Sequence, residues 1–305
     1  MGKCFYSILS FAILSLQILT GQNITVGSGG DFPTLAAAES SIDAGDTVFI
    51  LDGTYSNGTQ FLEDRNGTAT QPIVIMAQNE HGAIFQGGTE AIHLINCTYL
   101  EIHGLVITGQ TGNGINIDDG GDYSTPAHHI TIANCEFRDM NSSGNSDFLK
   151  LSGLDNFWVH HCTFDNGGAG GSGIDMVGCH QGTIEDNNID NAGVTGIQAK
   201  GGTQHILIRR NILKDMSQRA LNLGGSTGLQ FFRPPLSEVQ DSFEAADLEV
   251  YSNVFIGNHA PVAYVGCVRV KVYNNTLFKP VNWAMRILQE TTAPGFLTCS
   301  AVSYT

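Results

Sequence analysis

Residues 184–225 read IEDNNIDNAGVTGIQAKGGTQHILIRRNILKDMSQRALNLGG and contain two successive copies of one pattern. Each copy begins with a run of alternating apolar and polar residues that includes an Asn. It continues through a turn rich in Gly or polar residues and ends with a second alternating run. The two equivalent residues, Asn187 and Asn211, are 24 positions apart. Alternation with a period of two inside a repeat of this length is typical of strands stacked coil upon coil in a solenoid.

The same repeat extends to both sides of this stretch. The first strand of each coil is assigned to runs such as 184–189 and 206–213, and the second to runs such as 195–200 and 219–224. One shared turn position holds Cys135, Cys162, Asn187, Asn211, Asn253 and Asn275. Stacked Asn amides at this position are expected to hydrogen-bond to the backbone of their own coil and to one another. One coil is longer because of an insertion over residues 230–246, which we expect to be a loop over one face or a short helix.

The second strands predict an outer face on which polar side chains form rows. Successive side chains of a strand point to opposite faces, so one apolar set faces the core. The inward set is Ile115, Ile117, Leu149, Leu151, Ile174, Met176, Ile197, Ala199, Leu221 and Leu223. The outward row, our candidate substrate-binding surface, is Asn116, Lys150, Asp175, Gln198 and Asn222, to which a strand over 281–288 adds Arg286. A flanking row on one side contains Asp118 and Lys200, and the row on the other side contains Asp147 and Arg219.

The N-terminal segment is typical of a secretory signal peptide. Lys3 supplies a positive charge, residues 5–19 are almost wholly apolar, and small residues follow. Residues 1–21 are therefore assigned to a signal peptide and residues 22–305 to a single β-helix domain, which we expect to be secreted or periplasmic. A retained membrane anchor is the alternative.

Both ends of the solenoid need a cover, because an end coil otherwise exposes the core. Ala-rich residues 33–42 predict a short helix before the first coil, with Asp31 as its N-cap. No closing coil is recognisable after residue 288, so we expect the sequence to be truncated at the C-terminus, with cover by another chain as the alternative.

The composition favours an all-β protein and argues against a nucleic-acid partner. Gly is abundant, with 37 residues, and only 14% of residues are charged, which fits many turns and few exposed helices. The formal net charge of −15 would repel nucleic acid. No segment after the signal peptide is apolar enough to cross a bilayer, so no membrane partner is expected. The cysteines of the repeat are interpreted as small buried side chains, with disulfides as the alternative.

Several motifs resemble one known group of proteins. They are the segments AGDTV at 44–48, GTY at 53–55 and QPIVI at 71–75, followed by the coils with Asn at their turns. Together they resemble the pectin-lyase-like right-handed parallel β-helix proteins. Within that group the likeness is closest to polysaccharide lyase family 6, the alginate and chondroitin lyase branch. The resemblance covers nearly the whole mature chain and implies an all-β, right-handed parallel β-helix.

The resemblance also implies an activity. Enzymes of that family bind an anionic polysaccharide along the outer face of one sheet and use a Lys base and an Arg acid, often with Ca²⁺. Lys200 matches the Lys position of the family. The Arg position falls near Gly224 instead, and Arg219, five residues earlier in the same coil, is the nearest substitute. Asp118 and Asp175 are the candidate Ca²⁺ ligands, because hard oxygen donors suit that ion.

The chemistry of β-elimination defines what the candidate residues must do. The reaction needs a base for the C5 proton of a uronate, stabilisation of the resulting negative charge, and an acid for the leaving oxygen. Lys200 is the candidate base and Arg219 the candidate acid or charge stabiliser. In the alternative interpretation these cations only form surface ion pairs, and the protein is a non-catalytic carbohydrate-binding or adhesion solenoid. A glycan hydrolase is a third interpretation, for which the sequence shows no carboxylate pair.

Overall fold

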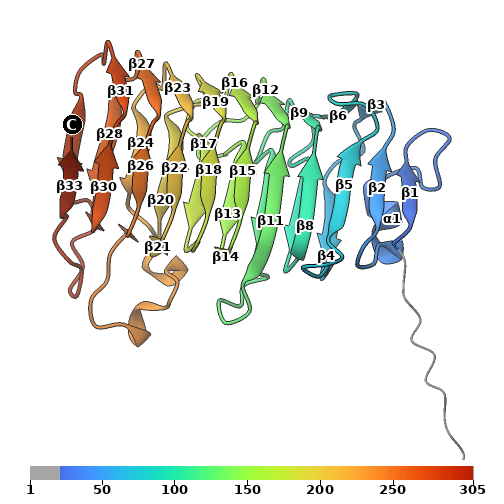
Figure 1. The fold of residues 1–305 in the computed structure, drawn as a ribbon, viewed down its shortest axis with the longest axis horizontal. Coiled ribbons are helices and arrows are strands. Elements are labelled where there is room, and N and C mark those ends of the chain that lie inside the picture. Colours follow the sequence, from blue (N-terminus) through green and yellow to red (C-terminus); the bar gives the residue numbers. More distant parts are fainter. Residues whose placement is uncertain (1–20, 305) are drawn as a thin grey trace, which may run out of the picture.

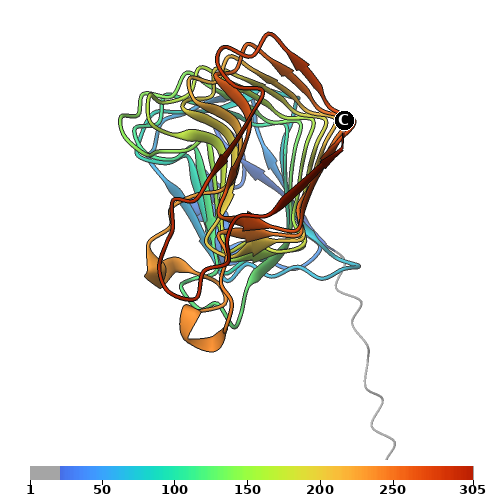
Figure 2. The ribbon, with the colours of Figure 1, turned by 90° about the vertical axis from the view of Figure 1, so that its left-hand side faces the viewer.

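The chain folds as a right-handed parallel β-helix, as the repeat predicts (Figure 1). The computed structural model describes residues 21–304, so all but the last residue of the expected signal peptide lies outside the described part. Every pairing between named strands joins one coil to the next in parallel, for example Asn188↔Ile212. Viewed along the stack, the sheets surround a central core (Figure 2).

Three long sheets run the length of the stack, and their strands follow chain order. Sheet A contains β1 (Asn23–Val26), β2 (Thr47–Ile50), β5 (Ile73–Ala77), β8 (Thr98–His103), β11 (Ala127–Ala133), β15 (Trp158–His160), β18 (Thr183–Glu185), β22 (Leu207–Arg209), β26 (Glu249–Tyr251), β30 (Val270–Tyr273) and β33 (Ala301–Tyr304), with β14 (Leu154–Asp155) paired to β11. Sheet B contains β3 (Gly53–Tyr55), β6 (Ala83–Gln86), β9 (Val106–Thr108), β12 (Glu136–Arg138), β16 (Thr163–Asp165), β19 (Asn188–Asp190), β23 (Ile212–Lys214), β27 (Val254–Ile256) and β31 (Thr276–Phe278).

Sheet C is built from the predicted second strands. It contains β4 (Gln60–Glu63), β7 (Ile92–Ile95), β10 (Ile115–Asp118), β13 (Leu149–Ser152), β17 (Ser172–Val177), β20 (Thr195–Lys200), β24 (Arg219–Gly224), β28 (Ala260–Val265) and β32 (Met285–Leu288). A short corner sheet, β21 (Thr203–Gln204), β25 (Ala245–Ala246) and β29 (Cys267–Val268), connects sheet C to sheet A. All ten apolar residues predicted to face inward are buried.

The assignment of one strand to each first run was wrong, because each run forms two strands. Run 184–189, for instance, is divided between β18 in sheet A and β19 in sheet B. The chain bends at a residue in the left-handed conformation, Asp186, followed by Asn187. The equivalent bends use Asn134, His161, Arg210, Ser252 and Asn274, all with φ between 51° and 57°. Across the bend the in–out alternation shifts by one position, because the buried Ile184 and Ile189 are five residues apart.

The expected Asn ladder is present at these bends. The Asn211 side-chain oxygen accepts hydrogen bonds from Asn187 N at 3.1 Å and Asn187 Nδ2 at 3.0 Å. The Asn211 amide in turn donates to Ile184 O at 2.9 Å and to Asn253 Oδ1 at 3.0 Å. The ladder continues to Asn275 in one direction, and in the other Asn187 Oδ1 accepts from the Cys162 backbone N–H. Because each side chain bonds to the neighbouring coils, the ladder fixes their register.

The cysteines are free thiols within the described residues. Cys97, Cys135, Cys162, Cys179 and Cys267 are buried and Cys299 is partly exposed. The interpretation of the repeat cysteines as small buried side chains is therefore confirmed.

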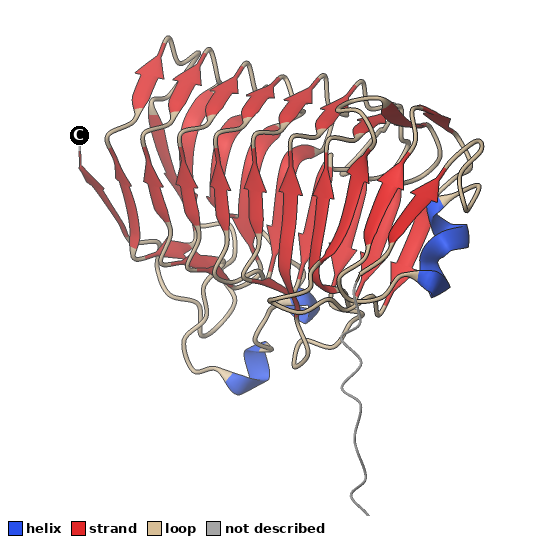
Figure 3. Ribbon diagram, turned by 45° about the vertical axis from the view of Figure 1, so that its right-hand side comes forward, coloured by secondary structure: helices blue, strands red, loops and turns tan. Residues whose placement is uncertain are grey.

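A short helix covers the first coil, but its N-cap differs from the prediction (Figure 3). Helix α1 (Leu35–Ala38) continues into the 3₁₀ turn η1 (Glu39–Ser41), and Leu35 and Ala38 are buried. The cap is Thr34, whose hydroxyl accepts from Ala37 N at 3.1 Å. The prediction of Asp31 as cap was wrong, because its carboxylate instead accepts hydrogen bonds from Thr25 N and Oγ1 at 2.8 and 2.7 Å.

The insertion is a surface loop rather than an α-helix. It contains two 3₁₀ turns, η2 (Leu229–Phe231) and η3 (Leu236–Glu238), and lies outside the coil on the lower side of Figure 2. Arg233 anchors it through two hydrogen bonds to the Asp155 carboxylate, at 2.8 and 3.1 Å. Glu244, which is fully buried, holds the end of the loop by accepting from Gly201 N at 3.0 Å. No helix in residues 21–304 has the length and apolar character needed to cross a membrane.

The ladder predicts a large cost for removing one of its members. Asn211→Ala would leave the buried amide groups of two neighbouring coils without partners, so the free energy of unfolding is expected to fall by about 3 kcal/mol. Asn188→Ala, at an exposed neighbouring position, is the matched control and is expected to change it by less than about 0.5 kcal/mol. Urea unfolding followed by circular dichroism measures both, and equal effects would contradict the role of the ladder.

Candidate functional site

The predicted outward row is present on sheet C. The strand register pairs Asn116 with Lys150, Lys150 with Asp175, Asp175 with Gln198, and Gln198 with Asn222. The complete row, in coil order, is Phe61, His93, Asn116, Lys150, Asp175, Gln198, Asn222, Ala263 and Arg286. Neighbouring members stand about 4.8 Å apart. This surface, which we call the sheet C row, is long enough for several sugar units of a chain that lies along the stack.

The centre of the row is one carboxylate between two amines. Asp175 Oδ2 forms an ion pair with Lys150 Nζ and lies 3.2 Å from Lys200 Nζ. Asp175 is completely buried, whereas the side chains of Lys150 and Lys200 are 20% and 12% exposed. Asp175 Oδ1 has no hydrogen-bond partner among the described residues. The carboxylate therefore serves as a buried support that presents two amines to the outer surface.

A second buried carboxylate lies next to this centre. Asp147 Oδ1 accepts a hydrogen bond from Ser172 N at 2.8 Å, and Asp147 Oδ2 is 3.8 Å from Lys150 Nζ. Burial and, secondarily, the negative charge of Asp175 raise the pKa of Asp147 to about 7. Burial acts to lower the pKa of Lys150, but the charges of Asp175 and Asp147 outweigh it and raise that pKa above its ordinary value. Lys150 therefore stays cationic at neutral pH, while Asp147 changes its charge there.

The structure does not bring Lys200 and Arg219 together. Arg219 begins β24 and is paired with Thr195, whereas Lys200 ends β20. The two backbone positions are five residues apart along the strand direction, which is roughly 17 Å. The Arg219 guanidinium donates to Asn222 Oδ1 at 2.9 Å and to Glu290 Oε1 at 2.7 Å. Arg219 and Lys200 therefore lie at opposite ends of neighbouring strands.

The remaining members of the row lie to either side of the centre. Gln198 is partly exposed between Asp175 and Asn222, and Asn222 itself is almost fully buried. Arg286 lies at the far end, with its guanidinium 4.5 Å from the centre of the Trp283 ring. At the other end, Asn116 Nδ2 is 3.3 Å from His93 Nε2. The row therefore ends in a cation over an aromatic ring on one side and in His93 next to Phe61 on the other.

The donor set does not fit the Ca²⁺ ion that the resemblance implies. Asp175 is already neutralised by two cationic amines, which would repel a metal ion. Asp118 Oδ2 lies 2.6 Å from His93 Nε2, and strand β13 separates β10, which carries Asp118, from β17, which carries Asp175. Within residues 21–304, no three His, Cys, Asp or Glu side chains are grouped so that they could hold a metal ion.

Sequence reasoning missed several residues that shape this face. His93 lies between Glu90 Oε2, at 3.1 Å, and Asp118 Oδ2. Phe61, half exposed on β4, lies 5.4 Å from the His93 ring. The alternation of buried and exposed residues along β4 and β7 is enough to place both residues in the outer row. The contact of Glu290 with Arg219 had no such signal, because Glu290 lies in an irregular segment.

The raised pKa of Asp147 predicts how stability depends on pH. In the unfolded chain this carboxyl ionises near about pH 4, whereas in the folded chain it stays protonated up to about pH 7. The free energy of unfolding therefore falls as pH rises through this window, with a slope of at most about 1.4 kcal/mol per pH unit from this group. Asp147→Asn is expected to remove that contribution, as measured by urea unfolding at intervals from pH 4 to 8. Asp190→Asn, on sheet B, is the control and is expected to keep the wild-type slope; an unchanged slope in Asp147→Asn would refute the assignment.

Solved structures with a similar fold are numerous, but their sequences are distant. A rhamnogalacturonan lyase matches with a TM-score of 0.55 and 13% identity, over 92% of this chain and 84% of that one. The pectate lyase Pel9A matches with a TM-score of 0.53 and 13% identity, over 88% and 79%. The tailspike protein of E. coli bacteriophage HK620, in complex with a pentasaccharide, matches with a TM-score of 0.56 and 12% identity, over 88% and 60%. At these identities the likeness shows the fold alone.

Comparison by sequence identifies the family but no individual relative. A search of curated proteins finds no match. The family model described as "Right handed beta helix region" matches residues 90–277, which is more than half of the chain. That segment includes the Asn ladder and most of the sheet C row. The chain belongs to this family of right-handed β-helix proteins.

Proposed function

We propose that this protein is a secreted or periplasmic enzyme that cleaves a uronate-containing polysaccharide by β-elimination on the outer face of sheet C. The observation that carries the proposal is the sheet C row with its cationic centre, Lys150 and Lys200 on the buried Asp175. A continuous polar row fits an extended chain, and amines in its centre fit a sugar carboxylate. The signal-like segment before residue 22 supports the location.

The similar structures support a polysaccharide as the partner. Two of them are named as lyases, of rhamnogalacturonan and of pectate, and a third was solved with a bound pentasaccharide. Each name describes that protein and not this one. For this chain the argument therefore depends on the residues of the row, and the shared fold makes an extended sugar polymer the natural ligand class.

The two amines suit different steps of the reaction. Lys150, whose pKa is raised by its carboxylate neighbours, is cationic and is placed to neutralise the carboxylate of the bound uronate. Neutralisation makes the C5 proton more acidic and stabilises the enolate that follows. We assign Lys200, which shares the Asp175 carboxylate with Lys150, as the base that takes the C5 proton. The C4–O4 bond then breaks, a C4–C5 double bond forms, and the protonated Lys200 returns the proton to the leaving oxygen.

The other cations are assigned to neighbouring sugar units. Arg219 is too far along the strand from Lys200 to act on the same ring, so it is proposed to bind another carboxylate of the polymer. Arg286, at the end of the row beside Trp283, provides a further cationic position. Gln198, Asn222 and Asn116 supply hydrogen-bonding groups between these charges. The net charge of −15 does not by itself prevent binding of an anion, because four basic side chains, Lys150, Lys200, Arg219 and Arg286, lie on this face.

A non-catalytic carbohydrate-binding or adhesion protein is the second candidate. The separation of Lys200 from Arg219 favours it, because the resemblance implies that a lyase holds both around one sugar. Such a protein would use the same sheet C row for binding but would release no product.

Product formation distinguishes the two candidates. The protein is incubated with alginate, polygalacturonate and chondroitin, each with added Ca²⁺ and with a chelator, and the absorbance of the unsaturated product is followed. We expect activity on at least one of these polymers, and the chelator arm tests the implied need for Ca²⁺. Measurable binding without any absorbance change would reject the lyase and support the adhesion protein.

The role of Lys200 has its own test. Lys200→Ala is expected to lower kcat by about a hundredfold or more, because the proton at C5 loses its acceptor. Lys214→Ala is the matched control: Lys214 forms an ion pair with Asp190 on sheet B, outside the proposed site, and its loss should leave kcat within about twofold of wild type. Equal activity of the two variants would remove Lys200 from the mechanism.

A further inference from the structure

The outer face of sheet A carries a second row of side chains that the proposed reaction does not use. Figure 1 looks onto this face, where no loop of the described chain crosses the strands. We propose that it is a separate glycan-binding surface, which holds a polysaccharide chain of uncharged sugars along the stack. The proposal is independent of lyase activity on sheet C.

The row contains aromatic and charged side chains from successive coils. The strand pairing aligns His160 with Glu185, Glu185 with Arg209, and Arg209 with Tyr251. Tyr251 is aligned with Tyr273, and Trp158 lies on the same strand as His160, two residues earlier. From Trp158 to Tyr273 the row crosses four coil steps, or about 19 Å. The aromatic rings at its two ends are therefore separated by several sugar units.

Trp158 gives the strongest argument for a ligand on this face. Its side chain is 42% exposed, although it is a large apolar group on a flat sheet. The ring is nonetheless held in place, because its Nε1 donates to Glu185 Oε1 at 3.0 Å and its centre lies 3.8 Å from that of His160. Stacking on a neighbour explains the orientation of the ring but not its exposure. A fixed, exposed indole is the kind of surface on which the C–H face of a sugar packs.

The middle and far end of the row are also fixed in position. Arg209 forms an ion pair with Glu185 through Nε and donates to the Tyr251 hydroxyl at 2.8 Å through Nη1. The Tyr251 and Tyr273 rings stack, with centres 5.2 Å apart and planes 9° from parallel. Glu185 is only 5% exposed although it lies on the outer face. These contacts set the geometry before any ligand arrives, which reduces the entropy cost of binding.

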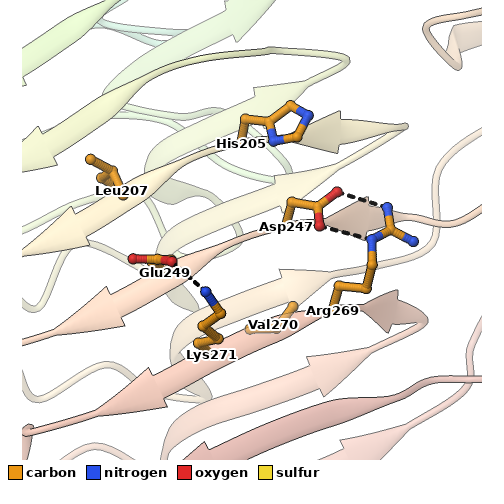
Figure 4. A pocket seen from close by; sticks show the side chains of 7 residues that line it. All are labelled: His205, Leu207, Asp247, Glu249, Arg269, Val270 and Lys271. Atoms are coloured by element: carbon orange, nitrogen blue, oxygen red, sulfur yellow. Dashed lines mark hydrogen bonds and ion pairs between the residues drawn. The ribbon is translucent and has the colours of Figure 1, made fainter.

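A shallow pocket of about 570 Å³ continues this surface at the edge of the row (Figure 4). Arg269 makes two hydrogen bonds to the Asp247 carboxylate, at 2.8 and 2.7 Å, and Lys271 Nζ lies 2.8 Å from Glu249 Oε1. His205 completes the polar side of the pocket. Donors and acceptors are therefore both available to sugar hydroxyls.

The charges of this face select the class of sugar. Each carboxylate of the row and pocket has a cationic partner: Glu185 pairs with Arg209, Asp247 with Arg269, and Glu249 with Lys271. The face is therefore close to electroneutral, in contrast to the sheet C row, where two amines share one buried carboxylate. An anionic polymer would gain little here and would compete with the existing ion pairs. Neutral sugars, which offer hydroxyls and apolar ring faces, fit the lining.

The chain offers a direct test because it has only two tryptophans, Trp158 and Trp283, one near each row. In Trp283→Phe, the remaining indole reports on sheet A alone. This variant is titrated with a soluble glucan, a soluble galactan and polygalacturonate while tryptophan emission is recorded. We expect a saturable change with at least one neutral polymer and none with polygalacturonate. No saturable change with either neutral polymer, or a response to polygalacturonate alone, would overturn the proposal.

Two further variants show whether the row itself is responsible. In the Trp283→Phe background, Tyr251→Ala and Tyr273→Ala are each expected to weaken binding of the neutral polymer by about tenfold. Unchanged affinity in both, with a wild-type circular dichroism spectrum, would also overturn the proposal. The reciprocal variant, Trp158→Phe, keeps only Trp283 and reports on sheet C. Failure of the sheet A proposal is therefore separable from failure of the lyase, which is read from product absorbance.

Discussion

The structure depends on one requirement: every buried backbone amide at the bend between sheets A and B must find a partner. Asn187, Asn211 and Asn253 meet this requirement with their side chains. Each side-chain oxygen accepts a hydrogen bond from a backbone N–H of the preceding coil, and each side-chain NH₂ group donates to a backbone carbonyl of that coil. Because each side chain spans neighbouring coils, the bonds also align one coil with the next. The position of Lys150, Asp175 and Lys200 on sheet C follows from that alignment, since their side chains meet only when the coils are in register.

The fold and the outer row were predictable because both follow from local pattern. Period-two alternation in segments such as 172–177 and 195–200 is enough to separate core from surface, and stacking in register converts residues far apart in sequence into neighbours. The row from Asn116 to Arg286 therefore follows from taking the equivalent outward position in each second strand. The same argument placed Lys200 at the end of its strand, as the structure has it.

Other features depend on contacts that alternation does not encode. Thr34 and Asp31 are both good capping residues, and only the competing hydrogen bond from Thr25 decides between them. The burial of Asp147, and with it the raised pKa, depends on how densely Ser172 and Lys150 pack around it. The helix cap and the raised pKa of Asp147 therefore could not be predicted from the alternation of apolar and polar residues.

The bends have a further consequence for how the chain tolerates change in length. A residue added or lost at the bend after Asp186 would shift the alternation of sheet B and break the ladder. The corner between sheets C and A tolerates a change in length: the long insertion lies there, and Asn211 and Asn253, which are 42 residues apart as a result, still bond to each other at the bend between sheets A and B. Insertions and deletions are therefore accommodated best at the corner next to the sheet C row. Divergence or engineering can remodel the rim of that row there while the scaffold beneath it remains unaltered.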